Sequence, residues 1–338
     1  MIRFKIKGAS HSLQGGQVFH SQKPSTYQDA PPGRVKTLTA EIEHGKPWRD
    51  AVKDHFGQNN PWLHRIVTAQ ARTNYLKTIP PKPTDLILDI GAGWGQSSLA
   101  LTASNLVCGV EPSPEKISFV RAAARQEGLA DNLALVEADF LDLDFDTRFD
   151  YVACIGVLEW IGASRPESNP PDAQARFLKQ IHATLKKNGK LVIGIENRLG
   201  LKYLMGARDD HIALPNVCCY DFALAQNKYK KATNGDLRTL THTMAEYDDL
   251  LRQAGFVETK FFAALPDYKL PERIFPISED GSSCEWNDFL TAGHWIKEHD
   301  GVDGSPLPNQ EELRSHSLSL ARMNLAHYFA PSFFIEAT

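Results

Sequence analysis

Residues 86–95 have the sequence LILDIGAGWG, a short apolar run that leads into a turn with three glycines. The run has the length and composition of a strand that is covered on both faces of a parallel sheet. Glycines at alternate positions let the backbone turn tightly and approach a ligand closely. The following residues, 96–101, begin a helix whose first turn has free N–H groups. The stretch therefore predicts a strand–turn–helix unit that binds a nucleotide-like ligand.

The residues around the turn indicate which ligand this is. A dinucleotide site follows the pattern G-x-G-x-x-G, with the pyrophosphate at the helix start. Here Gly91 and Gly93 fit, but the third position is Gln96 and Gly95 comes one residue early. Asp89 lies two residues before the first glycine, where its carboxylate would repel a pyrophosphate but suits an ammonium group. S-adenosylmethionine has an ammonium group and no phosphate, so the turn favours this cofactor over an ordinary corner without a ligand.

Acidic residues end the next two predicted strands. The strand at 106–110 leads to Glu111, about 20 residues beyond the first glycine, where a ribose-binding carboxylate is expected. Its two oxygens can accept both ribose hydroxyl protons. The strand at 133–140 places Asp139 to accept from the adenine amino group and the Phe140 N–H near a ring nitrogen. A fourth strand is predicted at 149–157, with its exit beside the sulfonium. The candidate cofactor-binding residues are Asp89, Gly91, Ala92, Gly93, Gly95, Gln96, Glu111, Pro112, Asp139, Phe140, Ile155 and Gly156.

These features, in this order and spacing, resemble the class I S-adenosylmethionine-dependent methyltransferases. The resemblance covers residues 84–197 and resumes at 244–262. It implies an α/β, Rossmann-like fold with a seven-stranded, mostly parallel sheet, helices on both faces and an antiparallel last strand. It also implies S-adenosylmethionine as the cofactor, while the methyl acceptor stays open because this fold serves many acceptors. The residues that carry the resemblance are Asp89–Gly95, Glu111, Asp139-Phe140, Gly156–Glu159 and Asn188–Leu191.

The chain outside the core is predicted to form an N-terminal arm and two insertions that make a cap. The arm is expected to be irregular apart from a strand at 1–7 and helices at 48–56 and 61–79. The expected segments are the arm and lid helix at 1–80, the cofactor-binding core at 81–197, the cap insertion at 198–243, the continued core at 244–264, the second insertion at 265–330 and the final core strand at 331–338.

Apolar periodicity and turn residues predict the other elements. Strands are expected at 190–196, 255–262 and 331–337. Lys186–Gly189 is expected to be the C-terminal stop of a helix at 173–185. Further helices are expected at 115–126, 285–299 and 310–328.

Charge and composition limit the classes of partner. The 338 residues carry a formal net charge of −4, but residues 1–80 have twelve Lys and Arg against five Asp and Glu. These basic residues are scattered singly, so a solvated arm is favoured over a nucleic-acid surface. No apolar run reaches about 18 residues, so no membrane span is predicted. The five cysteines lack metal-ligand spacing and predict a reducing cytoplasm, and no metal is predicted.

Methyl transfer to a hydroxyl needs a base that takes up the hydroxyl proton. His211 is the first candidate, because it follows two acids that could orient it and because imidazole titrates near neutrality. His242 and Glu159 are the other candidates, and Glu159 follows the fourth strand, where acceptor-contacting residues fall. The alternative for the histidines is a surface or packing role. Asp209 and Asp210 could also hold a cation, but no third ligand at a suitable spacing is evident.

A second resemblance concerns the acceptor. Residues 196–211 and 266–271 are similar to stretches of bacterial methyltransferases associated with cell-surface glycan assembly. The resemblance points towards a sugar hydroxyl as the acceptor. It implies Asp210, Asp267, Tyr268 and Lys269 as substrate-binding residues.

The leading hypothesis is therefore an S-adenosylmethionine-dependent O-methyltransferase of polysaccharide biosynthesis. It would act in the cytoplasm on a sugar or another hydroxylated small molecule, by in-line transfer with a general base. One alternative is methylation of RNA or protein, which the basic arm motivates. Another is a non-catalytic cofactor-binding scaffold whose cap serves as a partner surface. The acceptor atom and the oligomeric state stay open.

Overall fold

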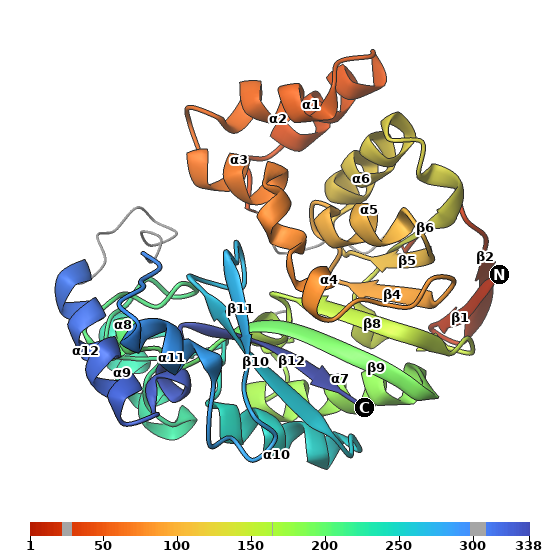
Figure 1. The fold of residues 1–338 in the computed structure, drawn as a ribbon. Helices are drawn as coiled ribbons and strands as arrows, with labels where there is room; N and C mark the ends of the chain where they lie inside the picture. The colour runs from red at the N-terminus through yellow and green to blue at the C-terminus, as the bar shows by residue number, and fades with distance from the viewer. Residues whose placement is uncertain (22–28, 164, 298–308) are drawn as a thin grey trace. The chain divides into compact units, whose positions relative to one another are not determined.

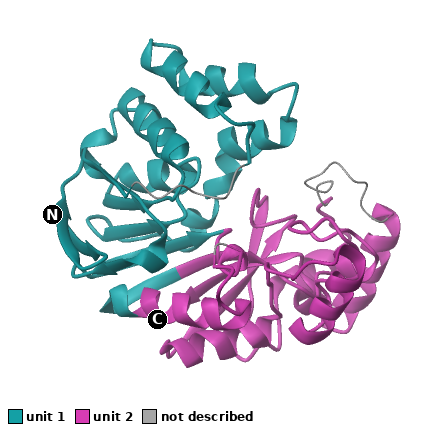
Figure 2. Cartoon of the chain, turned by 180° about the vertical axis from the view of Figure 1, so that it is seen from behind, with its two compact units in different colours: residues 1–155, 183–191 teal, residues 156–182, 192–338 magenta. Residues whose placement is uncertain are grey.

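The computed structural model describes residues 1–21, 29–163, 165–297 and 309–338. Within it the chain divides into two compact units (Figure 2). The first unit comprises residues 1–155 and 183–191, and the second comprises 156–182 and 192–338. Strand β9 (Leu185–Glu196) contributes to both units, because the division falls between residues 191 and 192. The separation into arm, core and insertions that the sequence suggests stays a prediction.

The first unit is built on a mostly parallel sheet (Figure 1). In its central strand, Leu88 lies opposite Cys108 on one side and Val152 on the other. All three side chains are fully buried, as expected for strands covered on both faces. The strand order is β3 (Val18–His20), β6 (Leu133–Glu137), β5 (Leu106–Val110), β4 (Leu86–Ile90), β8 (Phe149–Ile155) and the first part of β9.

Two helices pack on the strands around the glycine turn. α5 (Gln96–Thr102) follows the turn directly and contacts β4 and β5, which confirms the expected strand–turn–helix unit. α6 (Pro114–Gln126) contacts β6 and confirms the helix expected at 115–126. α6 begins at Pro114 because the Ser113 side chain accepts a hydrogen bond from the Lys116 N–H and Pro114 takes the first helical position. A short 3-10 turn, η2 (Ala130–Asn132), leads into β6.

The N-terminal arm contains more regular structure than the sequence predicts. β1 (Ile2–Ile6) confirms the strand expected at 1–7, and it pairs antiparallel with β2 (Ala9–Leu13) and β7 (Leu143–Phe145). β2, β3 and helix α1 (Arg34–Glu43) lie where an irregular chain was expected, so that prediction was wrong. β3 is held by pairing with the distant β6, and α1 packs on α6. A local sequence pattern does not reveal such long-range support.

The helix expected at 61–79 is interrupted. α2 (Trp48–Phe56) has the bounds that the sequence predicts, but the next helix, α3 (Pro61–Thr68), ends where Ala69 has extended backbone angles. Two short elements follow, η1 (Gln70–Thr73) and α4 (Tyr75–Thr78). The break lets the buried Tyr75 hydroxyl donate to the Ser97 hydroxyl over 3.0 Å. Ala69 is a good helix former, so its local propensity gives no sign of the break.

The second unit contains sheet strands β11 (Arg273–Pro276), β10 (Thr259–Leu265), β12 (Ser332–Ala337) and the last part of β9, and β10 pairs antiparallel with both β11 and β12. In the pairing of β10 with β12, Phe262 lies opposite Phe334, which confirms the antiparallel last strand. All seven expected strands are present among the described residues. β3 and β11 are additional edge strands, and the expected α/β fold class is confirmed.

The stop expected at Lys186–Gly189 was wrong. The preceding helix, α7 (Pro170–Thr184), ends before it, and these four residues lie inside β9. Lys186 Nζ donates to both carboxylate oxygens of Asp150 over 2.8 and 2.7 Å. A Cβ atom on Gly189 would lie 2.9 Å from the Phe149 carbonyl oxygen. The glycine is therefore needed for close strand pairing and not for a helix cap.

Two helices of the second unit are shorter than the sequence predicts. The helix expected at 285–299 ends at residue 291, and its last two residues lie outside the described part. The helix expected at 310–328 ends at residue 322 and is followed by a 3-10 turn. No helix in the described part of the chain is long and apolar enough to cross a membrane. The elements are η4 (Leu158–Trp160), α8 (Leu201–Leu204), α9 (Phe222–Thr233), α10 (Met244–Ala254), α11 (Glu285–Thr291), α12 (Gln310–Arg322) and η5 (Ala326–Phe329).

Candidate functional site

The glycine turn of the first unit has the backbone that its sequence predicts. Gly91, Gly93 and Gly95 have φ angles of 68°, 54° and 80°, a region that side chains with a Cβ atom rarely adopt. A Cβ atom on Gly95 would also lie 2.8 Å from a methyl carbon of Val120. The backbone is therefore left bare where α5 begins, which fits a ligand that approaches the main chain.

Glu111 links the turn to the start of α6. Its Oε2 atom accepts a hydrogen bond from the Gly93 N–H and its Oε1 atom accepts one from the Ser113 N–H, both over 3.0 Å. Burial raises the pKa of this carboxyl, against the attraction of Lys116 and the two backbone hydrogen bonds. A carboxylate has about four acceptor positions, so each oxygen keeps one for a further donor. This arrangement fits the two ribose hydroxyls of S-adenosylmethionine.

The turn is also tied to the N-terminal arm. Trp94 Nε1 donates to Asp29 over 3.0 Å, and Lys116 Nζ pairs with the same carboxylate at 2.9 Å. Gln96 Nε2 donates to the Ile66 carbonyl of α3 over 2.9 Å. The Gln96 amide, a candidate cofactor contact, is thus engaged in holding α3. Sequence reasoning missed Asp29, which lies in the stretch expected to be irregular and shows no motif.

Asp89 is buried under the turn, with 2% of its surface exposed. The Ser98 hydroxyl of α5 donates to its Oδ2 atom over 2.5 Å. Burial raises the pKa of this carboxyl to about 7, although the Ser98 hydrogen bond opposes the shift. Its contact with the cofactor ammonium stays a prediction, and the structure adds a structural role as partner of α5.

The Asp89→Asn substitution tests that structural role through pH. The unfolded-state pKa is near 3.8 and the folded-state pKa is about 7, so the folded state holds the extra proton between these values. Stability from this group therefore decreases as the pH rises towards 7, by up to about 4 kcal/mol. We expect the variant to gain stability relative to the wild type between pH 5 and pH 8 in urea unfolding. The exposed control Asp144→Asn should show no such change with pH. If the stability difference between Asp89→Asn and the wild type also does not change with pH, the assignment is contradicted.

The other cofactor candidates lie at strand ends in the expected order. Asp139 follows β6, and its Oδ1 atom accepts from the Leu141 N–H over 2.9 Å to start η3 (Phe140–Asp142). Phe140 is buried. Ile155 is the last residue of β8 and Gly156 begins the second unit with a φ angle of 74°. Ala92 is buried inside the turn, and Pro112 lies just before α6. Their contacts with a cofactor stay predictions.

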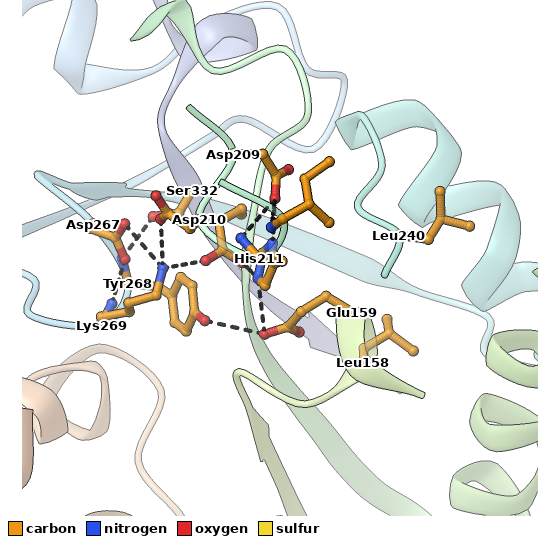
Figure 3. A network of polar contacts seen from close by, with 12 residues as sticks. Leu158, Glu159, Asp209, Asp210, His211, Leu240, Asp267, Tyr268, Lys269 and Ser332 are labelled. Carbon is orange, nitrogen blue, oxygen red and sulfur yellow. Dashed lines mark hydrogen bonds and ion pairs between the residues drawn. The ribbon is translucent and has the colours of Figure 1, made fainter. Parts of the chain in front are cut away.

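Charged side chains gather in the interior of the second unit (Figure 3). They come from the turn after β8, the end of β9, α8, the loop after α8 and the loop after β10. The buried cluster, as it is called below, consists of Glu159, Glu196, Lys202, Asp209, Asp210, His211, Asp267 and Lys269. It unites two of the predicted catalytic residues with three predicted substrate-binding residues.

His211 lies among three carboxylates of the buried cluster. Its Nδ1 atom is 3.3 Å from Asp209 Oδ1, and its Nε2 atom is 3.6 Å from Glu196 Oε2 and 3.8 Å from Glu159 Oε1. Its ring packs edge-on against Trp160, with the ring centres 5.0 Å apart. Burial alone lowers the pKa of His211, but attraction to Glu196 and hydrogen bonds to Asp209 and Glu159 outweigh it and raise the pKa well above its ordinary value.

Two lysines neutralise the other side of the buried cluster. Lys269 Nζ forms ion pairs with Glu196 Oε1, with Asp210 at 3.0 Å and with Asp267 at 3.5 Å. Lys202 Nζ lies 3.7 Å from Asp210 and 3.8 Å from Asp267. Burial lowers the pKa of Lys269, but these carboxylates outweigh it and raise the pKa. Asp210, Asp267 and Lys269 therefore already pair with one another.

Tyr268 lies beside the buried cluster, and two members of the cluster were not predicted. The Tyr268 hydroxyl donates to Glu159 Oε1 over 3.4 Å, and its backbone N–H donates to the Ser332 hydroxyl over 2.7 Å. Sequence reasoning did not select Glu196 or Lys202. Glu196 lies at the end of a predicted strand, as Glu111 lies directly after one. Its position could therefore have identified Glu196 as a candidate site residue. Lys202 gives no such signal, because its burial depends on the fold.

His242 lies elsewhere in the second unit. Its Nε2 atom is 2.8 Å from Gln174 Oε1, and its ring packs edge-on against Tyr247. Burial lowers the pKa of His242 to about 4. It lines a cavity of about 300 Å³ together with Arg198 and Glu246, which form an ion pair at 2.7 Å. The ring partners of His242 are not members of the buried cluster, so the structure separates the two histidine candidates by their contacts.

Comparisons with known proteins agree with the pattern of the glycine turn and of the strands that follow it. A family model described as a methyltransferase domain matches residues 88–193. A "Probable fatty acid methyltransferase" of Pseudomonas putida is 38% identical over 82 residues, 23% of this chain and 20% of that protein. A 2-phytyl-1,4-naphtoquinone methyltransferase of a Nostoc strain is 31% identical over 153 residues, 43% of this chain and 61% of that protein. The chain thus spans between a fifth and about three fifths of the length of these curated relatives.

Solved structures are similar to the chain as well, and one of them is the CcbJ methyltransferase from Streptomyces caelestis. It has a TM-score of 0.42 and 18% sequence identity, and the match covers 60% of this chain and 84% of that chain. The residues matched by the family model include the glycine turn, Glu111 and Asp139. Residues 88–193 therefore form a methyltransferase domain, and S-adenosylmethionine is its methyl donor.

Proposed function

We propose that the whole chain methylates a hydroxyl group of a sugar or another small molecule. The observation that carries the proposal is the buried cluster. Methyltransferase activity itself requires only a bound donor and an aligned acceptor, whereas a hydroxyl acceptor also has to lose a proton. A group of buried acid–base side chains that starts at Glu159, four residues after the end of β8, supplies that function.

In the proposed reaction a bond forms between the acceptor oxygen and the methyl carbon while the bond between methyl carbon and sulfur breaks. S-adenosylmethionine supplies the activated methyl group when it is bound. The hydroxyl proton passes to a side chain of this protein. We assign that role to Glu159, because its Oε2 atom is buried and has no hydrogen-bond partner in the described part of the chain.

His211 is then the charged partner of the base. Both of its ring nitrogens face carboxylates, at 3.3 Å on one side and 3.6 and 3.8 Å on the other. A neutral imidazole has one N–H donor, so two such contacts fit the protonated ring. This assignment differs from the sequence hypothesis, in which His211 itself takes up the proton. Asp209 fixes the position of His211, because its Oδ1 atom also accepts hydrogen bonds from the backbone N–H groups of His211 and Ile212 over 2.7 and 3.0 Å.

The Glu159→Gln substitution tests the proposal. We expect acceptor-dependent formation of S-adenosylhomocysteine to decrease about 10²-fold or more, the usual effect of losing a general base. Glutamine keeps the shape of the side chain, so S-adenosylmethionine affinity should stay within about twofold. The matched control is Glu167→Gln, an exposed residue of the same unit. Equal turnover in both variants would contradict the assignment of Glu159.

A further inference from the structure

The buried cluster contains more negative than positive charge. Its five carboxylates belong to Glu159, Glu196, Asp209, Asp210 and Asp267, and its two ammonium groups belong to Lys202 and Lys269. Before His211 is counted, this leaves an excess of three negative charges. Buried charge without a counter-charge is costly, so such a group favours the binding of a cation.

The excess of negative charge lies partly at Glu159 and Glu196, which face His211. Each offers one ligand atom, and these atoms all lie within 4.8 Å of one another. The side chains of both glutamates are 1% exposed and that of His211 is 4% exposed. The Oε2 atoms of both glutamates have no hydrogen-bond partner in the described residues. Figure 3 shows the Glu159 carboxyl group turned towards His211 and Tyr268.

A second set of three carboxylates nearby already pairs with a positive charge. Glu196, Asp210 and Asp267 also offer three atoms within 4.8 Å of one another. Lys269 Nζ pairs with all three, through the Oε1 atom in the case of Glu196. The Lys269 ammonium group therefore occupies the place that a metal ion would take there. It leaves Glu196 Oε2 available on the side of Glu159 and His211.

The imidazole of His211 is held in the way that metal-binding histidines are held. Its Nδ1 atom faces Asp209 Oδ1 at 3.3 Å, which leaves Nε2 directed at the two glutamates. Metal ligands of this type usually donate their other N–H to a carboxylate, which fixes the ring and raises its basicity. Two ligands about 2.1 Å from an ion at right angles are about 3 Å apart. The observed 3.6 and 3.8 Å separations exceed this by less than 1 Å.

We propose that Glu159, Glu196 and His211 bind a divalent cation, which takes the place of the Nε2 proton of His211 and of its positive charge, with Asp209 as the residue that positions the imidazole. Carboxylate ligands with one imidazole suit ions such as Mn²⁺. Three protein ligands leave about three positions of an octahedral ion open, which is enough for two adjacent hydroxyl oxygens. This inference rests on the proposed function, because the open positions are assigned to the hydroxyl acceptor. The acceptor would then be a molecule with neighbouring hydroxyls, such as a sugar.

Binding of Mn²⁺ to the full chain tests the site without any turnover. Electron paramagnetic resonance of free Mn²⁺ should show one saturable ion per chain. We expect His211→Ala and Glu196→Gln to weaken this binding about 10²-fold or more, and Asp209→Asn to weaken it about 10- to 100-fold. The exposed controls His316→Ala and Glu167→Gln should bind as the wild type does. Equal binding by cluster and control variants would overturn the site.

A second measurement needs no variant. Co²⁺ added to the wild-type chain should give visible absorption bands that saturate at one ion per chain and that Mn²⁺ competes away. No saturable binding of either ion would overturn the inference. A chain that binds one ion but methylates no hydroxyl would keep the site and contradict the proposed function. A chain that methylates hydroxyls at full rate after complete chelation would keep the function and overturn the site.

Discussion

Replacing Glu111 with glutamine is expected to weaken S-adenosylmethionine binding by about 10²-fold or more. The two ribose hydroxyls would each donate to a carboxylate oxygen, and a hydrogen bond to a charged group contributes about 1.5–3 kcal/mol. Two such bonds correspond to at least a factor of about 10² in the dissociation constant. Glutamine also turns one acceptor into a donor that faces the Gly93 or Ser113 N–H. Calorimetric titration of both proteins measures the effect.

Glu115→Gln is the matched control, because it removes a carboxylate in the first turn of α6 without touching the glycine turn. Its affinity should equal that of the wild type. A melting curve of the Glu111→Gln protein without cofactor separates lost binding from lost folding. Wild-type affinity in the folded Glu111→Gln protein would show that the carboxylate only supports the turn.

Replacing His211 with alanine is expected to decrease turnover about 10²-fold or more while S-adenosylmethionine still binds. The imidazole faces Glu159, Glu196 and Asp209, so its loss removes the positive partner of three buried carboxylates. The proton acceptor and the proposed cation would both be disturbed. Initial rates with saturating donor give the turnover, and calorimetry gives the donor affinity.

His316→Ala is the control, since this histidine is exposed on α12. His242→Ala is a second comparison, because its ring contacts Gln174 and Tyr247 instead of the buried cluster. We expect a smaller loss of turnover for it than for His211→Ala. Near-normal turnover of the His211→Ala protein would reduce His211 to a packing residue.

The candidate cofactor site at the glycine turn could be predicted because its signals are local. The glycine turn needs positive φ angles at Gly91, Gly93 and Gly95, and only glycine adopts these at low cost. Glu111 follows its strand at the expected distance. Asp89 shows the limit of such reasoning: its position in the motif gives no sign of the buried hydrogen bond with Ser98.

The buried cluster of the second unit could be predicted only in part. Glu159 was selected because it follows a predicted strand end, and such ends meet at one edge of a parallel sheet. His211 was selected because it follows two acids, and Lys269 because its stretch resembles those of glycan-assembly methyltransferases. Lys202 was missed, since a lysine in a short helix is ordinarily exposed and this one is buried by its carboxylate partners. The arm's strands were missed for a related reason, because β3 depends on pairing with the distant β6.

Titration of the wild-type chain with S-adenosylhomocysteine, and separately with NAD⁺, compares the two ligand classes that the glycine turn could serve. We expect saturable binding of one S-adenosylhomocysteine per chain and no binding of NAD⁺, because Asp89 and Gln96 disfavour a pyrophosphate at this turn. Binding of NAD⁺ without S-adenosylhomocysteine, or of neither ligand, would contradict the assignment of residues 88–193 as a methyltransferase domain that uses S-adenosylmethionine.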